Sequence, residues 1–307
     1  SAGWRMVNIL ISGYYGFDNI GDESILRTLV SSLREHIPDC SLTVLSHNPA
    51  STREKYGVEA VDRMSPMAIL RAVKKCDMLI SGGGSLLQDV TSSKSLHYYL
   101  SIIRCAEFFH KKVFIYSQGI GPIDRPGNRR AAAAALKRAD GIVVRDERSA
   151  ALLEEIGIAR DKVVITADPV IRMKKPDGDV GAEILRKAGV SLDGRLTVGW
   201  AIRERDTDSR FVKELLRSIQ MMKDKYNAQS VLIPFHYEED GEVCRHIAAQ
   251  LPDDTAVCLN EKYLSEDMLS IIGNMDLLVG VRLHSLIYAA IMGVPLIGIS
   301  YDPKCTA

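Results

Sequence analysis

The sequence predicts an α/β fold of two Rossmann-like, doubly wound domains in series, facing a central cleft. Three observations carry this prediction. Short β-branched runs alternate with longer segments of helical periodicity, as parallel strands joined by crossover helices require. A stretch containing Lys, Pro and Gly at residues 172–180 interrupts the alternation once, which is typical of an interdomain linker. The 307 residues, 46% of them hydrophobic, are enough for two cores. We therefore expect domains at 1–172 and 173–307.

The first domain is expected to contain six parallel strands, at residues 7–12, 42–46, 77–81, 113–117, 141–144 and 163–166. A helix follows the first strand and extends to about His36. Ser65-Pro66 opens another helix, because serine is a favoured N-cap and proline is tolerated at the first helical position. Further helices are expected near residues 93–110, 127–139 and 148–156.

The second domain repeats this alternation, with strands expected at 196–201, 230–234, 256–259, 277–281 and 296–299. Helices are expected near residues 208–226, 240–251 and 265–274 and from about Leu283. In open parallel sheets, ligands bind at loops that follow the carboxyl ends of the strands, so the two domains should line one cleft. The chain stops soon after its last strand without a covering helix, and we expect a truncation there.

Composition narrows the class of protein. Lys plus Arg and Asp plus Glu number 39 each, so the chain has no net charge that would attract nucleic acid. Any anion must therefore be bound by local groups. The six cysteines are scattered, without a CxxC or a Cys/His cluster, which favours reduced thiols in the cytoplasm and indicates no metal site. No run of about 18 apolar residues suggests a membrane span.

The first loop, GYYGFDNIGDE at residues 13–23, nearly matches a phosphate-binding P-loop. Gly16 and Gly21 have the required spacing, but Asp22 and Glu23 stand where Lys and Ser or Thr would hold phosphate and magnesium. Those carboxylates suit a helix N-terminus and the hydroxyls of a sugar. The loop is therefore either a substrate loop or a capped turn.

Two glycine-rich loops follow consecutive strands of the first domain. The first is SGGGS at residues 81–85, in which Gly83 and Gly84 allow a sharp turn and a nest of backbone N–H groups. A flexible connection is the alternative. The second, around Gln118, lacks the third glycine of a dinucleotide fingerprint and is a weak signal.

Cationic side chains follow one strand in each domain. Arg145 and Arg148 come after the strand at 141–144, where guanidinium groups match carboxylate or phosphate, although an ion pair with Asp146 or Glu147 is the competing interpretation. Asp168 is interpreted first as a turn residue and second as a ligand contact. Arg282 and His284 stand between a strand and a helix, and histidine suits proton transfer near neutral pH.

Lys304 follows the next strand and is a further candidate for the same crevice. His236, after the strand at 230–234, is a weaker candidate for proton transfer.

These loops together resemble the polysaccharide pyruvyl transferase family. The resemblance rests on GYYGFDNIGDE, SGGGSLLQD, SQGIGP, VRDERS, ADP and VGVRLHS in that order, and it covers both domains. The likeness is greatest to bacterial enzymes of the cell-surface anchoring type, which pyruvylate N-acetylmannosamine in a lipid-linked precursor of a secondary cell wall polymer.

The resemblance implies a GT-B-like fold, phosphoenolpyruvate as co-substrate without a further cofactor, a 4,6-ketal product, and peripheral attachment at the inner face of the membrane. It implies a catalytic set of Arg148, His284 and Lys304. The expected donor-binding residues are Arg145, Arg148, Arg282, His284, Lys304, Gly83 and Gly84. The expected acceptor-binding residues are Tyr15, Asp18, Asn19, Asp22 and Glu23.

Two other functions compete with this interpretation. A GT-B glycosyltransferase with a nucleotide-sugar donor would use the same glycines and cations, since fold alone does not decide function. A non-catalytic sugar-phosphate binding protein would not need the cations and the histidine to converge.

Overall fold

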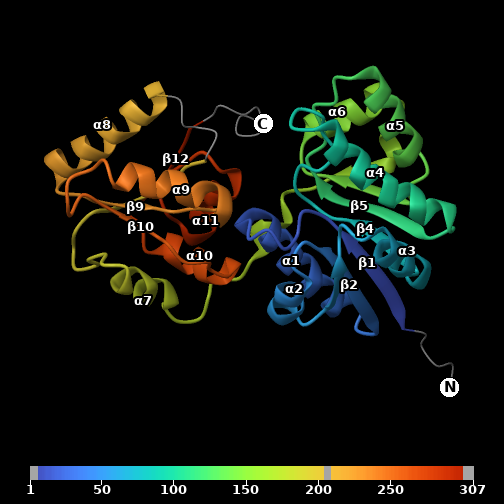
Figure 1. Ribbon diagram of the computed structural model, residues 1–307, viewed down its shortest axis with the longest axis horizontal. Helices are drawn as coiled ribbons and strands as arrows, with labels where there is room; N and C mark the ends of the chain where they lie inside the picture. The colour runs from blue at the N-terminus through green and yellow to red at the C-terminus, as the bar shows by residue number, and fades with distance from the viewer. Residues whose placement is uncertain (1–5, 204–208, 300–307) are drawn as a thin grey trace. The chain divides into compact units, whose positions relative to one another are not determined.

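The computed structural model describes residues 6–203 and 209–299 and consists of two compact units (Figure 1). Unit 1 comprises residues 1–17 and 22–169, and unit 2 comprises residues 18–21 and 170–307. Each unit is built on one parallel sheet with crossover helices, which confirms the predicted α/β class. Four residues of the first loop, 18–21, belong to unit 2.

Unit 1 has a seven-stranded parallel sheet in the order β3-β2-β1-β4-β5-β6-β7. Its strands are β1 (Val7–Ser12), β2 (Cys40–Ser46), β3 (Glu59–Asp62), β4 (Met78–Ser81), β5 (Lys112–Gln118), β6 (Gly141–Val144) and β7 (Val163–Ile165). Its helices are α1 (Ile20–His36), α2 (Pro49–Tyr56), α3 (Pro66–Lys75), α4 (Ser93–Phe108), α5 (Pro126–Leu136) and α6 (Glu147–Glu155), with the short helix η1 (Arg160–Lys162) near its end. The first two residues of α1 belong to unit 2, and the short helix η2 (Pro169–Arg172) spans the boundary between the units.

Unit 2 has a five-stranded parallel sheet in the order β10-β9-β8-β11-β12. Its strands are β8 (Thr197–Ala201), β9 (Gln229–Leu232), β10 (Ala256–Cys258), β11 (Leu277–Gly280) and β12 (Leu296–Gly298). Its helices are α7 (Val180–Lys187), α8 (Ser209–Tyr226), α9 (Tyr237–Ala248), α10 (Ser265–Gly273) and α11 (Leu283–Met292).

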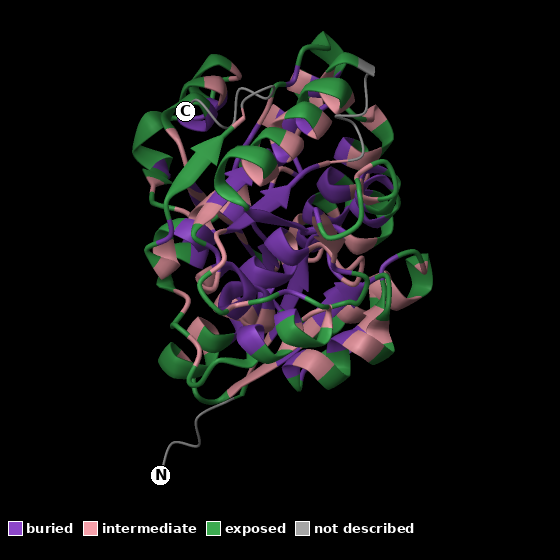
Figure 2. Cartoon of the chain, turned by 90° about the vertical axis from the view of Figure 1, so that its left-hand side faces the viewer, coloured by how far each residue is buried: buried purple, intermediate pink, exposed green. Residues whose placement is uncertain are grey.

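Alternation along β1 explains how unit 1 covers both faces of its sheet. Ile9 and Ile11 belong to one buried cluster with Leu26 and Leu29 of α1, whereas Leu10 belongs to another with residues of α3, α4, α5 and α6. Successive strand residues point to opposite faces, so a strand covered on both sides is apolar throughout. Central strands are accordingly buried and outer helix faces exposed (Figure 2), whereas edge strands such as β3 and β12 keep exposed residues.

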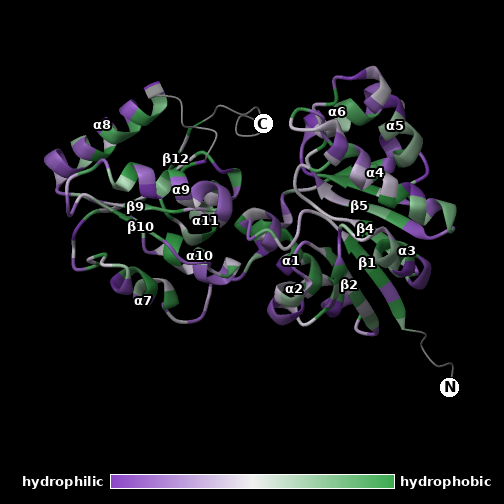
Figure 3. Cartoon of the chain, viewed as in Figure 1, coloured by the Kyte–Doolittle hydropathy of each residue, from purple (hydrophilic) through white to green (hydrophobic). Residues whose placement is uncertain are grey.

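Helix α8 shows how unit 2 covers one face of its own sheet. Leu215 and Ile219 of α8 are buried in a cluster with β8, β9 and α9. Other α8 side chains, such as Arg217, are exposed, and the helix has hydrophilic and hydrophobic parts (Figure 3). Because the helical period is about 3.6 residues, this spacing turns one apolar stripe toward the sheet.

Local capping explains two helices of unit 1. The predicted start at Ser65-Pro66 is confirmed, since the Ser65 side chain accepts a hydrogen bond from the Ala68 N–H at 3.3 Å. Helix α2 was not predicted, although Asn48 caps it and Gly57, with φ of 62°, ends it. Its sequence has almost no amphipathic character, so the cap signals were its only trace. Strand β3 and helix α7 were also not predicted.

An aspartate precedes corresponding strands in both units and ties each sheet together at its amino end. The Asp77 carboxylate, before β4, accepts from the Asn8 backbone N–H at 2.9 Å, and Asp276, before β11, accepts from the Thr197 N–H at 2.8 Å. The carboxylate thus satisfies a backbone donor at the start of the adjacent central strand, β1 or β8.

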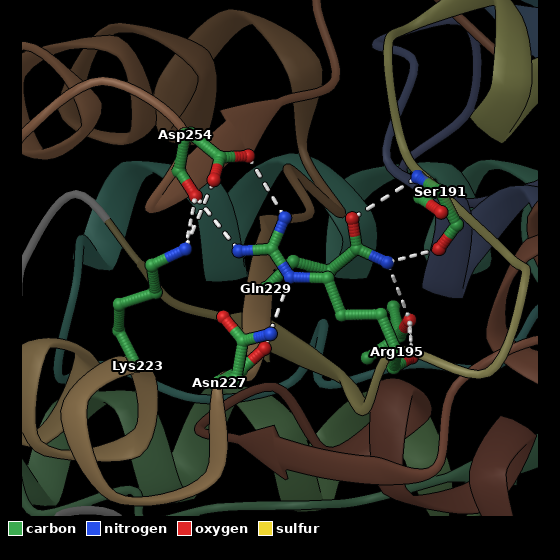
Figure 4. A network of polar contacts seen from close by, with 7 residues as sticks. Ser191, Arg195, Lys223, Asn227, Gln229 and Asp254 are labelled. Carbon is green, nitrogen blue, oxygen red and sulfur yellow. Dashed lines mark hydrogen bonds and ion pairs between the residues drawn. The ribbon is translucent and has the colours of Figure 1, made fainter.

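A second polar network holds the amino ends of β8, β9 and β10 (Figure 4). The Arg195 guanidinium donates to the Asp254 carboxylate at 2.8 Å and to the Asn227 carbonyl at 3.0 Å, and Lys223 Nζ lies 2.9 Å from Asp254. The Gln229 amide donates to Thr197 Oγ1 at 2.9 Å. These contacts fix the end of the sheet opposite to the strand-end loops.

Candidate active site

The carboxyl end of β1 in unit 1 is closed by Tyr15 and Glu23. Both side chains are buried. Glu23 accepts from the Gly16 N–H at 2.8 Å and from the Tyr56 hydroxyl. The Tyr15 ring fills the space that a side chain on Gly13 or Gly82 would need, because a Cβ on Gly82 would lie 2.0 Å from the Tyr15 hydroxyl. Two of the five predicted acceptor residues are therefore enclosed by unit 1.

Tyr15 remains a protonated phenol. Burial raises its pKa well above the ordinary value, and the nearby carboxylates of Asp22 and Glu23 raise it further. Both effects disfavour the phenolate, so Tyr15 is not suited to act as a base near neutral pH.

The Gly82–Gly84 turn after β4 is closely packed. A Cβ on Gly83 would lie 2.8 Å from Ile25 Cγ2, and one on Gly84 would lie 2.6 Å from Asp22 Oδ1. Gly84 also has φ of 94°, a conformation that favours glycine. The Gln118 side chain is buried and donates to Ser81 Oγ at 2.9 Å. The Gly82–Gly84 turn is thus tightly packed, and the Asp22 carboxylate lies against Gly84.

The two candidate arginines of unit 1 have different surroundings. Only 7% of the Arg145 side chain is exposed. Its guanidinium donates to Ser85 Oγ at 2.9 Å and lies 3.6 Å from Asp168 Oδ2 and 3.9 Å from Asp146 Oδ2. It therefore joins the strand-end loops after β4, β6 and β7. Arg148 is exposed on the first turn of α6, where Asp146 caps the helix by accepting from the Ser149 N–H at 2.7 Å.

An aromatic group around Arg63 was not predicted. Arg63 follows β3 and is only 9% exposed, and its guanidinium carbon lies 4.5 Å from the Tyr98 ring centroid and 5.0 Å from that of Phe17. Its Nη2 donates to the Tyr99 hydroxyl at 3.0 Å. The Phe17 ring in turn stacks on Tyr14, with centroids 4.0 Å apart. These contacts are cation–π and stacking interactions.

The sequence carried a partial signal for this group. Tyr14 and Phe17 lie within the first loop, but Arg63 could be placed only by recognising β3, and Tyr98 and Tyr99 only by knowing which side of α4 faces the loop.

Residues 18–21 lie on unit 2, over the carboxyl end of β9. The Ile20 N–H donates to the Phe235 carbonyl at 2.8 Å, and Asn19 forms an antiparallel bridge with His236. Lys262 Nζ lies 2.8 Å from Asp18 Oδ2. These contacts place two predicted acceptor residues, Asp18 and Asn19, in the same unit as the predicted donor residues Arg282 and His284.

His284 stands on the first turn of α11, directly after β11. Its Nδ1 is close to Gly21, since a Cβ built on Gly21 would lie 2.4 Å from that nitrogen. Arg282, one residue before the helix, is bound in a bidentate manner by the fully buried Asp240, at 2.6 and 3.1 Å, and lies 3.5 Å from Glu239. This ion pair neutralises much of the charge that Arg282 was expected to offer a donor.

His236 has a defined structural contact. It is buried at the N-cap of α9, where its Nδ1 accepts from the Glu239 N–H at 3.3 Å. Burial lowers its pKa, and the nearby Arg282 cation lowers it further, against the opposing effect of Glu239.

The structure thus divides the predicted residues into two groups. In unit 1, Tyr15, Asp22, Glu23, Gly83 and Gly84 lie around one turn, with Arg145 bound to the adjacent Ser85. In unit 2, Asp18, Asn19, Arg282 and His284 lie together. Lys304 lies outside the described residues.

Two classes of feature are absent from the part of the chain that the structure describes. Residues 6–203 and 209–299 contain no group of three or more His, Cys, Asp or Glu side chains arranged to hold a metal ion. No helix in these ranges has both the length and the apolar character to cross a membrane.

Comparison with known sequences gives two matches. The model of the family described as polysaccharide pyruvyl transferase matches residues 19–303. The amylovoran biosynthesis protein AmsJ of Erwinia amylovora is 21% identical over 355 residues, an alignment that covers 97% of this chain and 84% of AmsJ.

Solved structures share the fold. The UDP-GlcNAc 2-epimerase of Methanocaldococcus jannaschii aligns with a TM-score of 0.65 at 13% identity, over 98% of this chain and 86% of that one. Alr3699/HepE of Anabaena in complex with UDP-glucose also gives 0.65, at 11% identity, over 97% and 82%. At such identities the likeness shows the fold alone, a GT-B-like pair of Rossmann-like domains.

Proposed function

Because the chain belongs to the polysaccharide pyruvyl transferase family, we propose that phosphoenolpyruvate is its donor and an amino sugar of a lipid-linked cell wall polymer precursor its acceptor. The product is a 4,6-linked pyruvate ketal on an N-acetylmannosamine-type sugar. The observation that carries the proposal is the end of β11, where His284 lies on the first turn of α11 and contacts Gly21 of the first loop.

The reaction requires an acid/base group. Protonation of the methylene carbon of phosphoenolpyruvate builds positive charge on C2, to which a sugar hydroxyl adds. Phosphate then leaves, a second hydroxyl closes the ring, and each hydroxyl gives up its proton. Histidine is suited to carry these protons, and we assign this role to His284.

The donor carries a carboxylate and a phosphate, which require fixed cations and dipoles. The start of α11 suits an anion, since its first turn has no acidic residue and its N–H dipoles point outward. Lys304 is proposed as a cation for the leaving phosphate. Arg148 is proposed as the donor-binding arginine of unit 1 and Arg145 as the alternative.

The two arginines are separated by paired substitutions. Losing a charge-assisted contact to the donor should weaken phosphoenolpyruvate binding by about 1.5–3 kcal/mol, roughly 10- to 150-fold. We expect this loss for Arg148→Ala, measured by calorimetric titration, and expect Arg148→Lys not to restore binding. A larger loss in folded Arg145→Ala, with normal binding by Arg148→Ala, would transfer the role to Arg145.

The aromatic group of unit 1 supports a sugar acceptor. Tyr14 is partly exposed, whereas the Phe17 ring is stacked between Tyr14 and His47, with ring centroids 4.0 and 4.4 Å apart. We therefore assign to Tyr14 the contact with the apolar face of a sugar ring. Asp22, over the Gly84 turn, supplies a carboxylate for hydroxyls. Tyr14→Ala and Asp22→Asn should raise the acceptor KM and leave phosphoenolpyruvate binding unchanged.

The start of α3 supports attachment to a membrane surface. Met64, just before α3, and Met67, on it, are 65% and 58% exposed, and α3 also exposes Arg71, Lys74 and Lys75. Apolar side chains flanked by cations suit an anionic lipid surface. Co-sedimentation with phosphatidylglycerol vesicles, but not phosphatidylcholine vesicles, should decrease in Met64→Ser/Met67→Ser. Equal sedimentation of variant and wild type would contradict this assignment.

The deciding assay measures phosphate release and pyruvyl incorporation from phosphoenolpyruvate with a panel of lipid-linked and nucleotide-linked amino sugars. We expect incorporation into an amino-sugar acceptor with equimolar phosphate. Turnover of a nucleotide sugar as donor, without turnover of phosphoenolpyruvate, would instead establish a glycosyltransferase.

A further inference from the structure

The contact between Gly21 and His284 leaves little room for the imidazole to move. Gly21 is buried, and a Cβ there would lie 2.4 Å from Nδ1 and 3.0 Å from Cγ of His284. Atoms this close displace one another, so the ring occupies its position only because residue 21 has no side chain. The Gly21 backbone is itself fixed, since its N–H donates to Asn19 Oδ1 at 3.0 Å.

Residues 18–21 are held on unit 2 at both ends of the segment. Toward its end, the Ile20 N–H donates to the Phe235 carbonyl at 2.8 Å. At its start, Lys262 Nζ lies 2.8 Å from Asp18 and 2.7 Å from Glu238, the latter on the first turn of α9. The hydrogen bonds that Lys262 donates to Asp18 and then Glu238 raise its pKa, so the lysine remains a cation in this contact.

We propose that residues 18–21 position the His284 imidazole, Gly21 by direct contact and Lys262 indirectly by holding Asp18. This inference rests on the proposed function, in which His284 transfers protons. The segment comes from the first loop of the chain and carries none of the reacting groups itself. Asp18, Asn19, Gly21 and Lys262 are therefore positioning residues, and Asp18 and Asn19 need not contact the acceptor.

The physical consequence is a selective effect on turnover. Proton transfer depends on the placement of the imidazole to within about 1 Å, and a misplacement of that size can cost on the order of 100-fold in rate. Binding of phosphoenolpyruvate depends mainly on cations, which residues 18–21 do not carry, and on helix N–H groups. The N–H groups of Ile20 and Gly21, at the start of α1, already donate to Phe235 and Asn19. Loosening the segment should therefore lower kcat more than it changes the donor KM.

The test combines kinetics with a readout that needs no activity. The protein is labelled with ¹³C-histidine, and the ring resonance of His284 is assigned among the seven histidines as the one missing in His284→Gln. We expect Gly21→Ala to shift this resonance and to lower kcat by about 10- to 100-fold, with a small change in the donor KM. An unshifted resonance in folded Gly21→Ala would overturn the proposal.

Lys262 provides a second variant that leaves the buried contacts of Gly21 intact. Lys262→Met should shift the His284 resonance and lower kcat by about two- to fivefold, the size of an exposed ion pair, and Lys262→Arg should restore both. Lys187→Met is the matched control, because it removes the exposed Lys187–Glu261 pair, 3.6 Å apart, in the same unit. An equal effect of the control, or none of Lys262→Met, would also overturn the proposal.

The two proposals fail in different ways. If the resonance shifts as expected but His284→Gln turns over normally, the positioning stands and the catalytic role of His284 is wrong. If His284→Gln is inactive but neither Gly21→Ala nor Lys262→Met shifts the resonance, the catalytic role stands and the positioning is wrong.

Discussion

The two units share a five-stranded plan, to which unit 1 adds β6 and β7, and they differ at the turn that follows corresponding strands β4 and β11. Strands β3-β2-β1-β4-β5 of unit 1 correspond in order to β10-β9-β8-β11-β12 of unit 2, and Asp77 and Asp276 occupy matching positions. After β4, however, the chain forms the packed Gly82–Gly84 turn, whereas after β11 it presents Arg282 and His284. The same place in the same fold thus carries a packed glycine turn in one unit and, under the proposed function, an acid/base histidine in the other.

The largest loss of stability should follow removal of the ion pair between Asp240 and Arg282, beside the turn after β11. Asp240 is fully buried and neutralises Arg282, so Asp240→Ala leaves the Arg282 cation without its main partner. We expect a loss of about 3–5 kcal/mol in the free energy of unfolding, measured by urea denaturation. The double variant Asp240→Leu/Arg282→Leu should lose clearly less. A larger loss in the double variant would show that the pair is not the stabilising feature.

The aspartate that both units place before a central strand should contribute about equally to the stability of each unit. Asp77→Ala and Asp276→Ala each remove a charge-assisted hydrogen bond to a backbone N–H, at a cost of about 1.5–3 kcal/mol. Hydrogen exchange followed by mass spectrometry should show increased exchange in unit 1 for the first variant and in unit 2 for the second. Increased exchange in the same unit for both would contradict the correspondence.

The glycine turn of unit 1 can be compared with a glycine of unit 2 that has open space. Gly84 and Gly293 both have positive φ, 94° and 70°, but of the two only Gly84 has a neighbour, Asp22, within 4 Å of the position that a Cβ would occupy. Gly293→Ala should cost about 1–2 kcal/mol for backbone strain alone. Gly84→Ala should cost more by the amount needed to displace Asp22, and equal losses in thermal or urea unfolding would show that this contact is unimportant.

The smallest effect concerns the pH dependence of unit 2. Hydrogen bonds from Arg195 and then Lys223 lower the pKa of Asp254 to about 2, below the unfolded value of about 3.9. Its contribution is therefore present above about pH 4 and is lost as the pH falls to about 2. Asp254→Asn should be slightly less stable than wild type at pH 6 and equal to it near pH 2. The neighbouring exposed Asp253→Asn, as control, should not show this convergence.

The sequence predicted most long elements, but it missed the strongly amphipathic helix α7, which begins at the end of the predicted linker. Helix α1 and strands β1 and β5 have apolar runs or capping signals that determine their type alone. Strand β3 has four residues, Glu59–Asp62, and is recognised only by its pairing with β2. The start of α3 at Ser65-Pro66 was predictable because a cap is a local signal.

The candidate site was predictable in its residue types but not in its grouping. His284 was identified from its position between a strand and a helix. No periodicity indicated that residues 18–21 would lie on unit 2 beside it, because that contact depends on the tertiary positions of Phe235 and Lys262. Arg282 was expected to serve the donor, but its partner Asp240, 42 positions away, could not be inferred from spacing.

The central claim, proton transfer by His284 during pyruvyl transfer from phosphoenolpyruvate, is tested most directly by the His284→Gln variant. The measurement is the single-turnover rate of labelled pyruvyl incorporation into the acceptor, alongside phosphoenolpyruvate binding by calorimetry. Glutamine retains hydrogen bonds but does not shuttle protons, so we predict a rate lower by about 10²–10⁴-fold with donor binding preserved. Wild-type incorporation by a folded His284→Gln protein would contradict the assignment.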